Sequence, residues 1–164
     1  MTFLVERDPV HEAQLSTLEL LTGSLIGSGS CRDVYALPMR FEFRVGERSH
    51  WGAAVMKVAT SSAGISQNSH EFEIWDRVNW VEDLAPWFAP VWGSSDDGRV
   101  IVMQRAGPAP TPPYKVPACL TDLKLENFGR IGTRFVAIDY GLTRCMEKGL
   151  SKAMRRYQGN DPEF

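Results

Sequence analysis

The sequence predicts an α+β protein, in which one helix packs across a twisted antiparallel sheet and a proline-rich bridge leads to a smaller second part. Three observations predict this class. Short β-rich segments separated by glycine turns recur between residues 25 and 104, one long segment with helical spacing interrupts them, and five prolines lie between residues 107 and 117. With 164 residues and 43% hydrophobic content, the chain can bury a core of ordinary size.

The N-terminal region predicts a short amphipathic helix followed by a hairpin. Residues 8–21 place apolar side chains at helical spacing, namely Val10, Leu15, Leu18 and Leu21. Two β-rich pieces, residues 25–26 and 33–37, then flank the flexible turn Gly27-Ser28-Gly29. We therefore expect a glycine-lipped hairpin after the helix.

Lys57 is a cation inside a strand of small and apolar residues. Residues 40–45 alternate charged and apolar side chains, and residues 51–59 resume a strand pattern that contains Lys57. A buried ammonium is costly unless a carboxylate or phosphate accompanies it. In the alternative, the lysine stem lies along the sheet and the charged head reaches water.

A helix predicted over residues 68–81 supplies a candidate partner for this lysine. Its apolar positions are Ile74, Trp75, Val78 and Val81. At about 100° per residue, Glu71 falls on this apolar face, while Glu73 points the opposite way and faces Arg77. Glu71 is therefore the inward carboxylate. In the alternative, Asn68 caps the helix and Glu71 closes a capping box, and the two roles can coexist.

A second hairpin and an extended connector follow the helix. Residues 91–92 and 99–104 flank the turn signal Asp97-Gly98, and residues 103–106 then leave the sheet. The five prolines of residues 107–117 exclude both a helix interior and a central strand. This segment must connect two parts of the molecule.

A third hairpin brings oxygen ligands together. Residues 128–131 and 134–138 flank the turn Gly132-Thr133, and pairing outward from this turn sets Asn127 opposite Ile138. Asn127 and Asp139 are then neighbours at the open end of the ribbon. Carboxylate and amide oxygens are ligands that hold Mg²⁺ against phosphate oxygens.

Two charged residues precede this ribbon. Asp122 can accept a hydroxyl proton, and Lys124 can offer positive charge to a transferred phosphate. In the alternative, the segment is a solvated turn in which Asp and Asn occur as ordinary turn formers.

Four stretches of the chain, read in order, resemble the motifs of the protein-kinase-like superfamily. They are Gly27-Ser28-Gly29, Lys57, Asp122 with Lys124 and Asn127, and Asp139-Tyr140-Gly141. The chain looks most like the very small kinase-like proteins of some bacteriophages, over roughly residues 25–141. The resemblance implies a single kinase-like domain. Its N-lobe would span about residues 1–106, its connector 107–118, and a truncated catalytic lobe 119–164.

The resemblance also implies ATP and Mg²⁺ as cofactors. The cofactor-binding residues would be Gly27, Ser28, Gly29, Val34 and Lys57, with the two glycines over the phosphates, and Met103, Gln104 and Ala106 at the adenine hinge. Lys57 and its partner Glu71 would also belong to the catalytic set. Asp122 and Lys124 match the catalytic loop, and Asn127 and Asp139 match the metal ligands. Lys124, two residues after Asp122, is similar to the pattern of serine/threonine kinases.

Several positions depart from the family pattern. Arg32 replaces the third loop glycine, where it either stiffens the loop or itself reaches a phosphate. Leu120-Thr121 replaces the expected His-Arg pair, so phosphorylation of an activation loop is not expected to be the switch. The connector replaces two helices, and only residues 142–164 follow the Asp139-Tyr140-Gly141 motif.

The C-terminal region predicts a helix over residues 146–157, with a basic side formed by Lys148, Lys152, Arg155 and Arg156. These cations either favour the helix dipole or form a docking surface for an acidic partner, a host protein or a nucleic acid. Tryptophans are scattered through the chain at positions 51, 75, 80, 87 and 92. Exposed ones would form an interface or a homodimer patch, and buried ones would belong to the core.

Composition limits the remaining choices. The formal charge of -2 argues against general nucleic-acid binding, and three distant cysteines indicate neither a disulfide framework nor a zinc site. We expect a cytoplasmic protein without a membrane segment, in the host cytoplasm if phage-encoded. Two functions remain open: a minimal ATP- and Mg²⁺-dependent kinase acting on Ser or Thr of a partner protein, or a pseudokinase module that binds and modulates a host enzyme.

Overall fold

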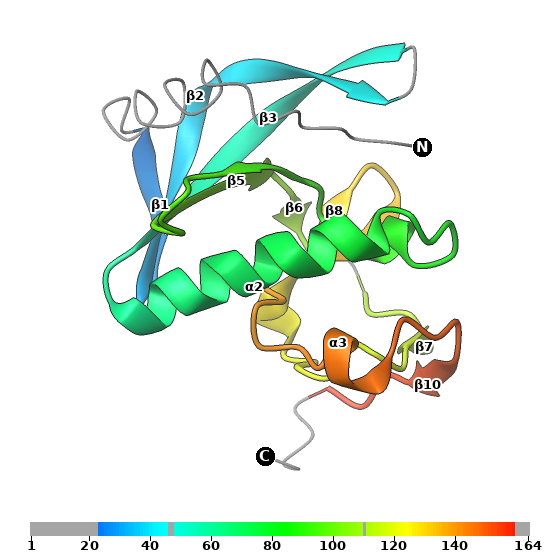
Figure 1. Ribbon diagram of the computed structural model, residues 1–164. Helices are drawn as coiled ribbons and strands as arrows, with labels where there is room; N and C mark the ends of the chain where they lie inside the picture. The colour runs from blue at the N-terminus through cyan, green and yellow to red at the C-terminus, as the bar shows by residue number, and fades with distance from the viewer. Residues whose placement is uncertain (1–22, 46–47, 110, 160–164) are drawn as a thin grey trace. The chain divides into compact units, whose positions relative to one another are not determined.

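The computed structural model describes residues 23–45, 48–109 and 111–159 (Figure 1), and the chain divides into two compact units. The first, called here the sheet unit, comprises Met1–Phe72 and Pro90–Arg105. The second, called the ribbon unit, comprises Glu73–Ala89 and Ala106–Phe164. The helix predicted over residues 8–21 lies outside the described residues. The fold is mixed α+β, with mostly antiparallel strands and one main helix, as the sequence predicts.

The sheet unit contains one five-stranded antiparallel sheet in the order β1-β2-β3-β5-β4. Its strands are β1 (Ser24–Ser28), β2 (Arg32–Val45), β3 (Arg48–Ala59), β4 (Val91–Ser94) and β5 (Val100–Gln104). The glycine-lipped hairpin is confirmed, because Gly27 pairs with Val34 and Ser28 with Asp33. The second hairpin is confirmed as well, and Gly98 takes a positive φ of 70° in its turn.

The main helix, α2 (Ser62–Val78), begins six residues before the predicted start. Ser61 is its cap, because the Ser61 hydroxyl accepts a hydrogen bond from the Gly64 N–H at 3.3 Å. Asn68 lies inside the helix, so the capping-box interpretation of Asn68 and Glu71 is wrong. The Ser61-Ser62 pair starts the helix earlier, and Gly64 permits close approach to the Cys31 carbonyl.

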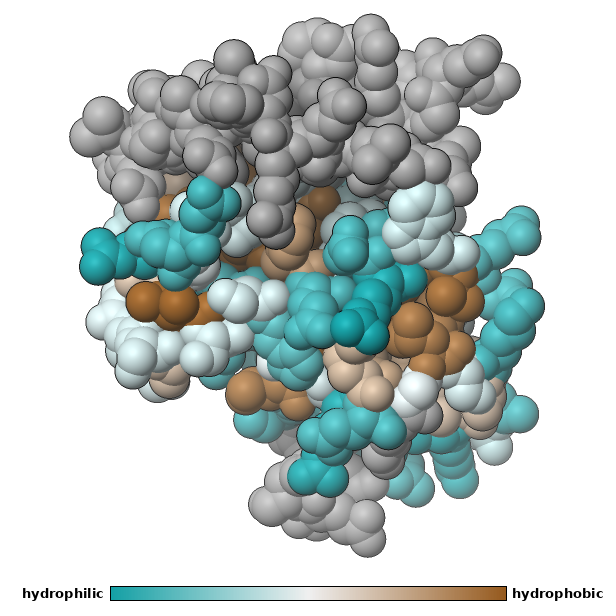
Figure 2. Space-filling model, viewed as in Figure 1, coloured by the Kyte–Doolittle hydropathy of each residue, from teal (hydrophilic) through white to brown (hydrophobic). Residues whose placement is uncertain are grey.

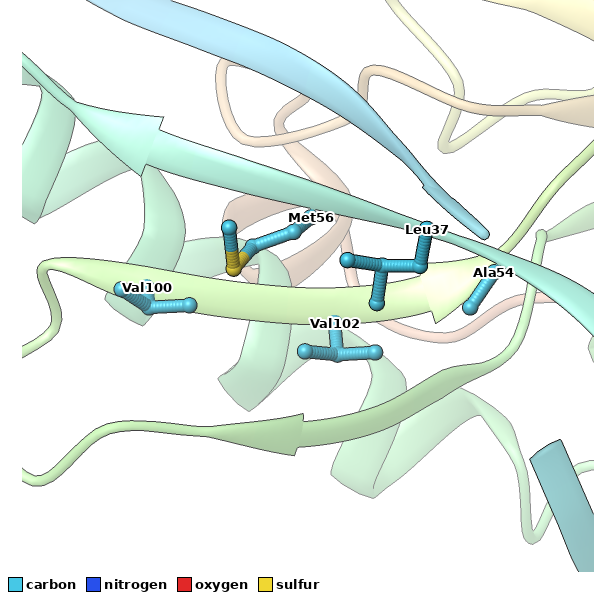
Figure 3. Close-up of a cluster of buried hydrophobic side chains, with 5 residues drawn as sticks. All are labelled: Leu37, Ala54, Met56, Val100 and Val102. Carbon is cyan, nitrogen blue, oxygen red and sulfur yellow. The ribbon is translucent and has the colours of Figure 1, made fainter. Parts of the chain in front are cut away.

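The core of the sheet unit includes a cluster formed by β2, β3 and β5 (Figure 3). Its members are Leu37, Ala54, Met56, Val100 and Val102, and Tyr35, Val58 and Trp92 pack against them. Met56 and Lys57 are neighbours on β3 and therefore project from opposite faces of the sheet. This apolar cluster thus forms on the face away from Lys57.

The ribbon unit is built from short elements. They are η1 (Ala85–Trp87), β6 (Gly107–Pro108), β7 (Lys115–Pro117), η2 (Leu125–Asn127), β8 (Phe128–Ile131), β9 (Arg134–Ala137), α3 (Cys145–Lys148) and β10 (Met154–Arg156). Strands β6, β8 and β9 form one sheet, and β10 pairs with β7 in another. The predicted third hairpin is confirmed, because Ile131 pairs with Arg134 across a turn in which Gly132 has a φ of 61°.

The proline-rich segment is extended, as predicted. Its two short strands lie where a missing N–H is tolerated, β6 at the edge of its sheet and β7 in a two-stranded pair. No described residue of the segment is helical.

The predicted C-terminal helix is wrong. Helix α3 has four residues and ends before Gly149, which takes a φ of 73°. Residues 154–156 then form β10, antiparallel to β7. The helix ends before the positive-φ Gly149, and Arg155 and Arg156 lie in β10, so the four cations do not form one basic helical side.

On the face drawn in Figure 2, brown hydrophobic groups are separated by teal hydrophilic ones. Trp75 is buried and Trp80 is 51% exposed, while Trp87 and Trp92 are half-buried. The tryptophans thus divide between the core interpretation and the exposed one.

Candidate functional site

The Lys57 ammonium and the Glu71 carboxylate form a buried ion pair in the sheet unit. The Lys57 Nζ donates hydrogen bonds to both Glu71 carboxylate oxygens at 2.9 Å. Lys57 is 5% exposed and Glu71 is fully buried, so the alternative in which the lysine head reaches water is wrong. Glu73 is instead exposed and binds Arg77 at 2.9 Å, so the choice of Glu71 as the inward carboxylate is confirmed.

Arg32 joins this pair from β2. Its guanidinium contacts the two Glu71 oxygens at 3.3 Å each, and it also donates to the Asn68 Oδ1 at 3.1 Å. Arg32 is 6% exposed. Arg32 therefore points into the layer between β2 and α2, and the Glu71 carboxylate binds two cations.

Asn68 fixes this part of α2 to the second hairpin. Its amide nitrogen donates to the Gly98 carbonyl at 3.0 Å and to the Arg99 carbonyl at 3.1 Å. Sequence reasoning missed Arg32 and Asn68 as members of the cluster. A signal was present, because Asn68 precedes Glu71 by three residues on one helical face, and Arg32 shares its strand face with Val34.

Sheet register places the glycine loop in line with the buried lysine. Gly27 pairs with Val34, Val34 with Lys57, and Lys57 with Ile101, so these positions form one row across four strands. Residues directly opposite each other on antiparallel strands project to the same face. The structure therefore brings Gly27 and Val34 to the face that carries Lys57.

The glycine turn is closed by its own backbone. The Gly29 N–H donates to the Arg32 carbonyl at 2.8 Å, and the Ser28 hydroxyl donates to Asp33 Oδ1 at 2.7 Å. Neither Gly27 nor Gly29 has a positive φ. A Cβ atom added at Gly27 would lie 3.8 Å from the Val34 Cβ, and one added at Gly29 would lie 3.5 Å from the Arg32 carbonyl oxygen. Alanine thus fits both positions sterically.

The three residues expected at the adenine differ in setting. Met103 is a core residue of β5, only 1% exposed, and pairs with Val55 and Val91. Gln104 is half-buried, and its N–H donates to the Pro90 carbonyl at 2.8 Å. Ala106 is half-buried in the ribbon unit, where a Cβ added at Gly129 would meet its methyl group.

The two expected metal ligands are backbone neighbours in the ribbon unit. The Asn127 carbonyl accepts hydrogen bonds from the Ile138 N–H at 2.8 Å and the Asp139 N–H at 3.3 Å. Asn127 is 9% exposed and Asp139 is half-buried. The prediction that Asn127 lies opposite Ile138 and beside Asp139 is confirmed.

One amide and one carboxylate fit the oxygen preference of Mg²⁺, which usually completes its shell with water and substrate phosphate. Among residues 23–45, 48–109 and 111–159, no group of three or more His, Cys, Asp or Glu is placed to hold a metal ion.

Tyr140 anchors the turn that contains Asp139. Its hydroxyl donates to the Ala89 carbonyl at 3.0 Å, and its ring meets the Phe88 ring edge-to-face at 5.1 Å. The Ala89 N–H in turn donates to the Ala137 carbonyl at 2.9 Å. This turn is thus held on both sides by the segment around η1.

The loop before the ribbon holds Asp122 half-buried and Lys124 exposed. Thr121 donates its N–H to the Thr143 hydroxyl at 2.9 Å, and its own hydroxyl accepts the Arg144 N–H at 3.0 Å. The loop is therefore tied to residues 143–144 through threonine side chains.

Lys57 and Glu71 belong to the sheet unit, and Asp122, Asn127 and Asp139 to the ribbon unit. A scan against protein-family models and a search of curated proteins gave no match to the chain. The family resemblance thus rests on the motifs of the chain itself. No helix among the described residues is both long and apolar enough to cross a membrane.

Proposed function

We propose that the chain binds ATP with Mg²⁺ and that its sheet unit is a protein-kinase-like N-lobe. The buried Lys57–Glu71 pair, with both contacts at 2.9 Å, carries this proposal. Replacing a buried ion pair by packed apolar residues is often neutral or stabilising, so stability alone does not account for such a pair. A ligand whose phosphate chain contacts the Lys57 ammonium would account for the buried pair.

The glycine turn supports the same proposal. Gly27 and Gly29 are required neither by a left-handed backbone nor by crowding within the chain. Glycine also serves where a ligand must approach the backbone closely, as at phosphate-binding turns. The row Gly27, Val34 and Lys57 would then present backbone, apolar contact and positive charge to one nucleotide.

The ribbon unit would supply the remaining chemistry. Asn127 and Asp139 would hold Mg²⁺, which when bound neutralises charge on phosphate oxygens. Asp122 would accept the proton of a Ser or Thr hydroxyl on a partner protein, and the exposed Lys124 would contribute positive charge at the transferred phosphate. The hinge residues Gln104 and Ala106 would contact the adenine.

A second candidate is a pseudokinase module that binds and modulates a host enzyme. One observation favours it: the described part of the ribbon unit contains only the end of α2 and the four-residue α3 as α-helix. Phosphoryl transfer depends on accurate positioning of the reacting groups. A chain whose catalytic loop packs against few helices would therefore bind nucleotide but transfer phosphate slowly.

A thermal-shift titration with Mg²⁺ and ATP tests nucleotide binding. ATP at 100 times its Kd should stabilise the wild type by about 2.7 kcal/mol, which raises the Tm by about 5–10 °C. Lys57→Met and Asp139→Ala should lose most of this shift. Lys152→Met, at an exposed lysine, is the matched control and should keep it. A wild type with no shift at millimolar Mg²⁺ and ATP would remove nucleotide from the proposal.

Labelled ATP separates the two candidates. The wild type, Asp122→Asn and the exposed control Asp96→Asn are incubated with [γ-³²P]ATP and a cell lysate. A kinase predicts labelling that Asp122→Asn loses and Asp96→Asn retains. Equal labelling by all three proteins would exclude catalysis that depends on Asp122 and leave the binding module.

A further inference from the structure

The strand that replaces the expected C-terminal helix contacts the Asp122 loop. Strand β10 pairs with β7 in the register Met154↔Pro117, Arg155↔Val116 and Arg156↔Lys115. Two further backbone bonds extend this pairing, from the Ala118 N–H to the Ala153 carbonyl at 2.8 Å and from the Tyr157 N–H to the Tyr114 carbonyl at 3.0 Å. The segment before the loop and the C-terminal strand are thus joined along their length.

Two side chains from this segment bond the carbonyls on either side of Asp122. The Arg155 guanidinium donates to the Thr121 carbonyl at 3.3 Å, and the Tyr157 hydroxyl donates to the Leu123 carbonyl at 2.9 Å. Residues two apart along an extended chain project to the same side, so one short segment reaches both carbonyls.

Tyr157 also contacts the base of the ribbon. Its ring meets Phe128 and Phe135 edge-to-face, with centroids 6.1 Å away in both cases, and these two rings stack on each other at 4.6 Å. Phe128 directly follows Asn127. One side chain therefore touches the loop of Asp122 through its hydroxyl and the ribbon of Asn127 through its ring.

We propose that Tyr157, assisted by Arg155, is a positioning residue that fixes the Asp122 loop relative to the Asn127 ribbon. This inference rests on the proposed function of these two residues. The loop at residues 118–124 has no regular structure, so its backbone geometry depends on such contacts. The C-terminal segment thereby supports the Asp122 loop through the Thr121 and Leu123 carbonyls.

Tyr157→Phe is the decisive variant because it removes the hydroxyl and keeps the ring. Tyr114→Phe is the matched control, since Tyr114 is 68% exposed and its ring lies 5.3 Å from the Arg156 guanidinium carbon. Hydrogen exchange of peptides covering residues 119–127 should speed up by about tenfold in Tyr157→Phe and stay unchanged in Tyr114→Phe. Unchanged exchange in both variants would overturn the proposal.

Kinetics separate positioning from a structural role. In a chain that transfers phosphate, Tyr157→Phe should lower kcat about tenfold while the KM for ATP and the Mg²⁺-ATP thermal shift stay unchanged. A KM increase with unchanged kcat would refute positioning of Asp122. If Tyr157→Phe lowers the Tm too far for comparison, Arg155→Met is the second variant. It should also show faster exchange in the peptides covering residues 119–127.

The two proposals fail in different ways. The exchange experiment requires no nucleotide, so it reports on the contacts of Tyr157 and Arg155 with the Asp122 loop even in a chain that binds no ATP. A wild type without a Mg²⁺-ATP thermal shift overturns the proposed function, and with it the functional part of this inference. Unchanged exchange beside a normal thermal shift overturns the inference alone.

Discussion

Glu71→Gln tests the central ion pair by removing one charge while keeping the side-chain shape. Glu71 is fully buried and contacts Lys57 at 2.9 Å and Arg32 at 3.3 Å. Removing one partner of a buried ion pair costs about 3–5 kcal/mol, because the remaining charge stays out of water. At about 2–4 °C per kcal/mol for a chain of this size, we expect the Tm to fall by about 6–20 °C.

Glu73→Gln is the matched control on the same helix. Glu73 pairs with Arg77, but both side chains are more than half exposed, so this pair contributes only about 0.3–0.5 kcal/mol. The two variants and the wild type are compared by circular-dichroism melting and urea unfolding without nucleotide. The control should melt within about 2 °C of the wild type.

Equal losses of stability in Glu71→Gln and Glu73→Gln would contradict the prediction. A loss below about 1 kcal/mol in Glu71→Gln would mean that water or another group compensates the cations, so that the pair is not a costly buried one. The Lys57–Glu71 pair would then no longer support ATP binding. A large loss accompanied by loss of the Mg²⁺-ATP thermal shift would agree with both roles of Glu71.

Three further predictions concern other parts of the chain. Gly64→Ala should destabilise the protein by about 1–3 kcal/mol in urea unfolding, although alanine favours helices, because the added methyl group would collide with the Cys31 carbonyl. Ser66→Ala, at an exposed position of the same helix, is the control. Equal stability of the two variants would contradict this packing. A thiol reagent at neutral pH should modify Cys31 alone in the native chain and all three cysteines in denaturant, because Cys119 and Cys145 are buried. The hydrogen bond to Cys119 and burial also raise the pKa of the Cys145 thiol. Rapid modification of all three thiols in the native chain would contradict this prediction. Burial and the charge of Glu126 raise the pKa of the Tyr157 hydroxyl above its ordinary 10.0, so the stability that this group contributes is complete below that pH and is lost as the pH rises through the raised pKa. In urea unfolding at rising alkaline pH, the wild type should therefore lose stability more steeply than Tyr157→Phe. Equal slopes in the two proteins would contradict this prediction.

Local patterns were sufficient for much of the fold and part of the candidate site. Turn signals such as Gly132-Thr133 fix which strands pair, and the register then follows outward to Asn127 and Ile138. Helical periodicity separated Glu71 from Glu73, because residues two apart on a helix project in different directions. These features depend on residues close together in the sequence, so the sequence alone predicted them.

The C-terminal strand and the full set of partners of Glu71 depended on contacts between distant residues. Residues 146–157 have helical composition, but the partner strand β7 and the positive φ of Gly149 decided their structure. Arg32 reaches Glu71 across 39 positions of sequence, and no local pattern determines which buried cation a carboxylate will serve. Sequence therefore determined the hairpins and the inward carboxylate, whereas long-range packing decided that Glu71 binds two cations and that Tyr157 holds the Asp122 loop.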